Sequence, residues 1–162
     1  MREQIAGTWL TQLIIIFMLI FVAFLALSLN YTKAFKVKNE LLTIIEKREG
    51  LTTGSDGSIA IINNYLKANN YGVTKSCEEG SYGVSNLNND TAEYVTSNAK
   101  KYFYCVSKIK SPSSNNQGKV YYRVNIFFYF NLPVLGDIFK FDVNGSSGDV
   151  ITPADQLIAK EE

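Results

Sequence analysis

The chain has 162 residues, about the length of one domain, and its 16 basic and 15 acidic side chains leave a net charge of +1. Nucleic-acid-binding domains carry a basic patch or stripe, so this balance gives no reason to expect a nucleic-acid partner. Histidine is absent. The commonest general base and the commonest transition-metal ligand are therefore missing, and we expect neither a cofactor nor a metal site.

Residues 10–29, LTQLIIIFMLIFVAFLALSL, contain no charged side chain. As a helix they would be about 30 Å long, which matches the hydrocarbon core of a bilayer. A core helix of a small soluble protein would keep a polar face, and this segment has none. A removable signal peptide is the alternative, but its small-residue cleavage site is poorly matched here. We predict a retained transmembrane helix, flanked by the interfacial rings of Trp9 and Tyr31, after a leader or cytoplasmic segment at 1–9.

The helix is predicted to continue outside the membrane as an amphipathic extension over residues 30–50. A short packing seam with spacings of three and four consists of Ala34, Val37, Leu41 and Ile44. The seam packs either on the chain's own domain or on neighbouring copies in a filament. Gly50 is expected to take the left-handed position that ends the helix, which would bring Leu51 back near Ile45.

Residues 51–150 are predicted to form a small domain that opens with a second helix. The apolar face of this helix would consist of Ile59, Ile62 and Leu66. Asp56 or Ser58 is available as its N-cap, and Gly72 as its stop. Residues 73–98 are rich in Asn and are expected to be irregular.

Strand character begins near Lys101 and is strongest over residues 119–130, where side chains alternate between two faces. One face is apolar and the other carries Phe127 and Tyr129, a pattern typical of a central strand. A turn at 132–136 and a last strand around Phe141 follow. The sequence therefore predicts an α+β fold in which an antiparallel sheet of three or four strands lies against the helices. A polar tail is expected at 151–162.

Cys77 and Cys105 are the only cysteines, and without histidine they cannot complete a common zinc site. We predict a disulfide, which requires an oxidising compartment; two unrelated buried thiols are the alternative. Lys33, Lys36 and Lys38 follow the span and, by the positive-inside rule, favour a cytoplasmic domain instead. We give more weight to the cysteines and predict a single-pass cell-membrane protein with an extracytoplasmic domain.

This arrangement resembles a type IV pilin or pseudopilin, most closely the TadE-like minor pilins of tight-adherence systems. The motifs that carry the resemblance are GTWLTQ at 7–12, FYFNLPVLGD at 128–137 and NGS at 144–146. The resemblance implies that a prepilin peptidase cuts between Gly7 and Thr8. Such families usually place glutamate fifth in the mature chain. Here that residue is Gln12, which cannot form a charge pair with a neighbour's terminal amine, so a minor subunit is favoured over a major one.

The resemblance implies a structural subunit that takes part in assembling a cell-envelope filament or secretion apparatus. Its partners would be the lipid bilayer, other pilin-like subunits and an assembly platform. A signal-anchored binding or sensory domain that does not assemble is the alternative. We do not expect an enzyme. The adjacent Glu78 and Glu79 would point to opposite faces of a strand, and no phosphate-binding glycine motif is present.

Overall fold

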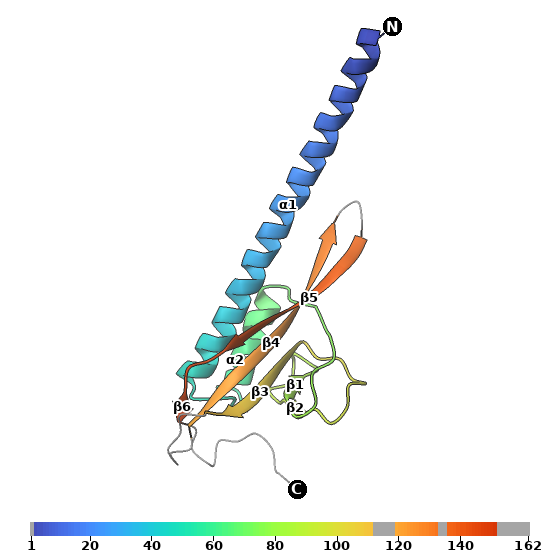
Figure 1. The fold of residues 1–162 in the computed structure, drawn as a ribbon. Coiled ribbons are helices and arrows are strands. Elements are labelled where there is room, and N and C mark those ends of the chain that lie inside the picture. The colour runs from blue at the N-terminus through green and yellow to red at the C-terminus, as the bar shows by residue number, and fades with distance from the viewer. Residues whose placement is uncertain (1, 112–118, 133–135, 152–162) are drawn as a thin grey trace.

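A computed structural model describes residues 2–111, 119–132 and 136–151 (Figure 1). The elements are helices α1 (Arg2–Lys47) and α2 (Ser58–Ala68) and strands β1 (Tyr82–Val84), β2 (Glu93–Tyr94), β3 (Tyr104–Lys110), β4 (Lys119–Leu132), β5 (Gly136–Ser146) and β6 (Val150–Ile151). The predicted turn at 132–136 and most of the predicted tail lie outside the described residues. Ile151 was assigned to the tail but belongs to the sheet, because it pairs with Lys119.

All pairings are antiparallel, in the order β2-β1-β3-β4-β5, and β6 pairs with β4 beyond the end of β5. The predicted α+β class is confirmed, but the sheet has six strands where three or four were expected. The additional strands contain only two or three residues each. Such short strands cannot show an alternating pattern, so they could not be found by periodicity.

The segment at 73–98 was expected to be irregular, and this was wrong in part. It contains β1 and β2, and Lys75 forms an isolated antiparallel bridge with Tyr102. The bridge is made by two backbone hydrogen bonds, of 3.0 Å from the Lys75 N–H and 2.8 Å from the Tyr102 N–H. These backbone groups find partners through tertiary pairing, which local sequence does not specify.

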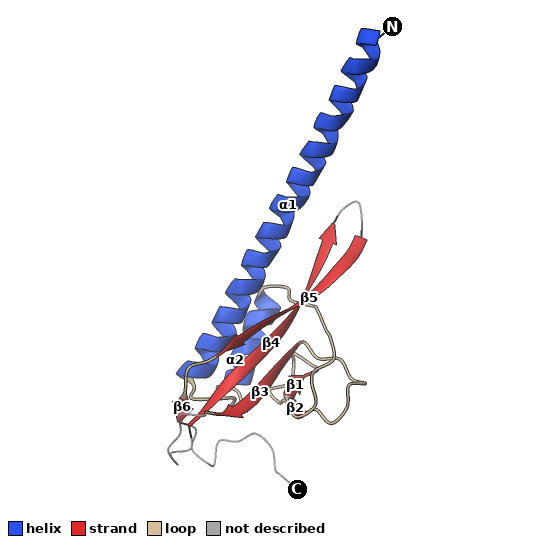
Figure 2. Cartoon of the chain, viewed as in Figure 1, coloured by secondary structure: helices blue, strands red, loops and turns tan. Residues whose placement is uncertain are grey.

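Both helices lie on one face of the sheet, and the main core lies between them (Figure 2). β4 supplies the centre of this core with alternate side chains, as its pattern predicted. The buried side chains on this face of β4 are Val120, Tyr122, Val124, Ile126 and Phe128. Asn63 of α2 is also buried, and its side chain is satisfied by the Tyr104 hydroxyl and the Asn89 carbonyl. The buried amide therefore carries no desolvation penalty from unmade hydrogen bonds.

α1 ends one residue earlier than the glycine predicted. Glu49, with φ of 57°, takes the left-handed position, and the Gly50 N–H donates to the Ile45 carbonyl at 2.9 Å. This is a Schellman ending in which Gly50 occupies the next position along. Gly50 is still required, because its own φ is 142° and an added Cβ would lie 2.7 Å from the Tyr122 hydroxyl.

The predicted ends of the second helix were also wrong. Gly57 is the residue before the first turn, and it caps the helix without a side-chain hydrogen bond. Ser58 instead accepts a hydrogen bond from the Thr52 N–H at 2.8 Å. The helix ends at Asn70, whose φ of 50° is left-handed, and not at Gly72. Asparagine tolerates this conformation because its short polar side chain can bond locally.

Candidate functional site

The N-terminal part of α1 is the most unusual surface of the molecule. Every large apolar side chain between Trp9 and Leu29 is between 44% and 75% exposed. This surface surrounds the helix on all sides and is far larger than the apolar patches that soluble monomers expose. Among the described residues, one helix is long and apolar enough to cross a membrane, and it is this one.

The few polar side chains of this segment are satisfied within the helix. Thr11 donates to the Gly7 carbonyl at 2.9 Å, Asn30 to the Ala26 carbonyl at 3.0 Å and Thr32 to the Ser28 carbonyl at 2.9 Å. Each bond reaches back four residues and adds to the backbone ladder. A helix whose polar groups are all paired internally can enter hydrocarbon, where no water replaces a missing partner.

The residues predicted for processing lie at the start of this segment. Gly7, Thr8 and Gln12 are all within α1 and all exposed. An added Cβ at Gly7 would meet nothing within 4 Å. No described part of the domain lies against these residues, and the Gly7–Thr8 peptide bond is helical. A peptidase would have to unwind the first turns to reach it.

The predicted seam lies where α1 enters the domain. Ala34, Val37, Leu41 and Ile44 are each 8% exposed or less and belong to the main core. They pack on the domain of the same chain, together with Ile45. The seam side chains are thus already covered within one chain.

The junction between the exposed and the buried parts of α1 is short. Tyr31 and Phe35 stack with their ring centroids 6.4 Å apart, and the Lys38 ammonium lies 3.8 Å from the Phe35 ring. Opposite Lys38, Gly145 of β5 allows the helix to approach. An added Cβ there would lie 2.7 Å from Leu42 and 2.8 Å from Lys38. The domain therefore begins at the end of the apolar segment, without a linker.

The predicted cysteine pair lies on the other face of the sheet. Cys77 and Cys105 are joined as a disulfide, with Cα atoms 5.7 Å apart. They form a second, smaller core with Val95, Tyr102 and Phe127. β4 was expected to be covered on both faces. This second face is covered at Phe127 but open at Arg123, which is exposed.

One functional side chain of this region had no signal in the sequence. The Tyr71 hydroxyl accepts a hydrogen bond from the Phe127 N–H at 2.9 Å and donates to the Phe127 carbonyl. β3 stops pairing with β4 at Ile126, so this hydroxyl takes the place of the missing strand. Burial raises the pKa of Tyr71, which keeps the hydroxyl neutral and able to donate.

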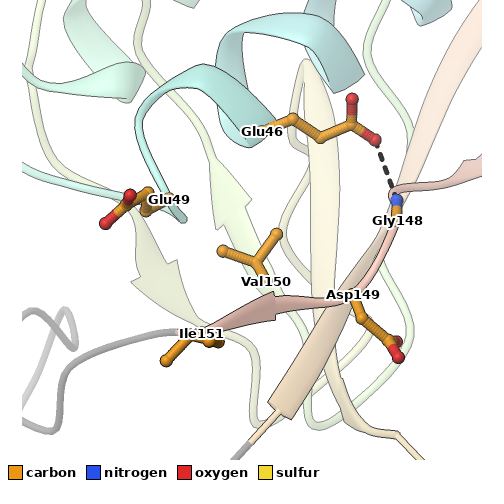
Figure 3. Close-up of a pocket in the computed structure, with 6 residues that line it drawn as sticks. All are labelled: Glu46, Glu49, Gly148, Asp149, Val150 and Ile151. Carbon is orange, nitrogen blue, oxygen red and sulfur yellow. Dashed lines mark hydrogen bonds between the residues drawn. The ribbon is translucent and has the colours of Figure 1, made fainter.

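Three hollows on the described surface were considered as binding sites. The first, of about 430 Å³, is shown in Figure 3 and is lined by Glu46, Glu49, Gly148, Asp149, Val150 and Ile151. Its carboxylates already have roles. Glu46 accepts from the Gly148 N–H at 2.8 Å, and Asp149 accepts from the Ser111 hydroxyl at 3.0 Å. These bonds hold the end of α1 to the edge of the sheet.

The other two hollows adjoin on the open face of the sheet and share Glu78 and Asn125. The Asn125 Oδ1 is buried without a partner, yet it is closed to solvent and a ligand in the hollow would not reach it. No group of three His, Cys, Asp or Glu side chains able to hold a metal occurs in the part of the chain that the structure describes.

No family model, curated protein or solved structure matches this chain. Its functional assignment therefore depends on the geometry of the chain itself. The surface that calls for a partner is the apolar half of α1.

Proposed function

We propose that this chain is a non-catalytic structural subunit anchored in the cell membrane by α1, with its C-terminal domain outside the cytoplasm. The observation that carries the proposal is the division of α1 into two parts. Its N-terminal half is apolar and exposed on every side, and its C-terminal half is packed into the domain. A bilayer is the partner that covers a helix of this length and composition.

The Cys77–Cys105 pair supports the outside placement, because disulfides persist in oxidising compartments. Lys33, Lys36 and Lys38 argue for the opposite side. Protease shaving of intact cells decides between them. We expect the domain to be degraded from outside while α1 is protected. A domain that is cut only after lysis would refute the outside placement.

We further propose a pilin-like role, as a minor subunit that is cut between Gly7 and Thr8 before it joins a filament or secretion assembly. The open space around Gly7 makes the test specific, because Gly7→Val should leave the fold intact. Mass spectrometry of the purified protein should find Thr8 at the N-terminus of the unaltered chain and Met1 in the variant. Gly72→Ala, at a second glycine with open space, is the matched control and should be cut normally.

A signal-anchored binding or sensory domain is the second candidate. The covered seam favours it, because Val37 and Leu41 are not available to pack against neighbouring copies. Met1 retained in the unaltered chain would support this candidate and exclude the processed pilin.

A further inference from the structure

The end of the sheet nearest the exposed half of α1 is a two-stranded ribbon. β3 pairs with β4 only as far as Ile126. Beyond it, β4 pairs with β5 alone, from Phe127 opposite Asp142 to Leu132 opposite Gly136. Figure 1 shows this ribbon projecting from the domain on the side from which the N-terminal half of α1 also leaves. An isolated two-stranded ribbon is at best marginally stable in water, so its free end calls for support.

The ribbon is long enough to reach the membrane surface. Its base is fixed at Gly145, which lies against Leu42 and Lys38 of α1. From Gly145 to Gly136, β5 is about 30 Å long, whereas α1 from Leu42 back to Leu29 is about 20 Å long. Even inclined by about 45° to the helix, the ribbon advances about 21 Å. Its free end therefore lies level with the end of the apolar segment.

The composition of this end suits a lipid surface. Residues 130–139, FNLPVLGDIF, contain a single charged residue, Asp137. The junction leaves little room for water beneath the domain. Ala34 is already buried in the core, and it follows Leu29 by about 7.5 Å, comparable with the thickness of a headgroup layer.

We propose that the free end of the β4–β5 ribbon lies in the headgroup layer of the bilayer that α1 spans, so that the domain contacts the membrane at two points. The inference rests on the proposed anchoring by α1. A single helix would let the domain rotate about the helix axis. A second contact fixes one face of the sheet relative to the membrane plane, and this would set which surfaces the domain offers to a partner.

Tryptophan fluorescence tests the contact, because Trp9 is the only tryptophan of the chain. In a Trp9→Phe background, Leu132→Trp reports on the ribbon end and Ile151→Trp is the control. Ile151 is 64% exposed and pairs with Lys119, at the opposite end of β4. The full chain is placed in phosphatidylcholine vesicles whose acyl chains carry bromine near the headgroup. We expect strong quenching by the brominated lipid for Leu132→Trp and none for Ile151→Trp, with the reverse order for aqueous iodide.

Asp137→Trp on the partner strand guards against a misfolded first variant and should behave as Leu132→Trp does. If iodide quenches both and brominated lipid quenches neither, the ribbon is in water and the proposal is wrong. Shielding from iodide without lipid quenching, and dependent on protein concentration, would place a second copy there and would also overturn it. The unaltered chain separates this failure from loss of the anchor, since brominated lipid should still quench Trp9 if α1 spans the membrane.

Discussion

Removal of one hydroxyl, by Tyr71→Phe, tests how the sheet is held where β3 ends. The ring would keep its edge-to-face contact with Phe128, at 5.5 Å between centroids. Only the bonds to the Phe127 N–H and carbonyl would be lost. A buried backbone group left without a partner costs about 1–3 kcal/mol, and partial access of water reduces the sum for two such groups, so we expect about 2 kcal/mol.

For a domain of this size that loss corresponds to a melting temperature lower by about 10 °C. The assay is thermal unfolding of the full chain in detergent micelles, followed by circular dichroism. Tyr94→Phe is the matched control, because the Tyr94 side chain is 55% exposed, and it should melt within about 2 °C of the unaltered chain. Hydrogen exchange gives a local readout, and the Phe127 amide should exchange faster in Tyr71→Phe. An unchanged melting temperature together with a protected Phe127 amide would show that the hydroxyl does not replace a strand.

Three other predictions concern the second face of the sheet and the buried tyrosines. Gly83→Ala should destabilise the domain by about 1–3 kcal/mol, because its Cβ would overlap the Tyr102 ring, whereas Gly72→Ala meets nothing; equal denaturation midpoints would contradict this. Replacing both Cys77 and Cys105 by serine should cost about 3–4 kcal/mol for a sequence separation of 28, and reductant should then leave the melting temperature unchanged. Burial raises the pKa of Tyr104, so stability that is complete below about pH 10 should be lost as the pH rises further. Absorbance at alkaline pH should show this tyrosine ionising only as the domain unfolds, and ionisation with the fold intact would refute the argument.

The strongest predictions from sequence were those with a local physical cause. The apolar segment at 10–29 needed only its length and lack of charge. The strand at 119–130 was found from alternation, which survives because one face of β4 is buried along its length. The helix ends were less well placed. Glu49 and Asn70 take left-handed conformations beside the glycines that sequence favoured, because the backbone bonds that close each helix decide the position.

Length, hydropathy and periodicity determined by themselves that an apolar helix leads into a small α+β domain, since these properties act within short stretches of chain. Only the tertiary structure decided that the seam at Ala34 and Leu41 is covered by the same chain and that Tyr71 completes the edge of β4. It also decided that the β4–β5 ribbon extends beyond β3. Each of these depends on residues far apart in sequence, whose contact is set by how the helices and the sheet pack and not by any local preference.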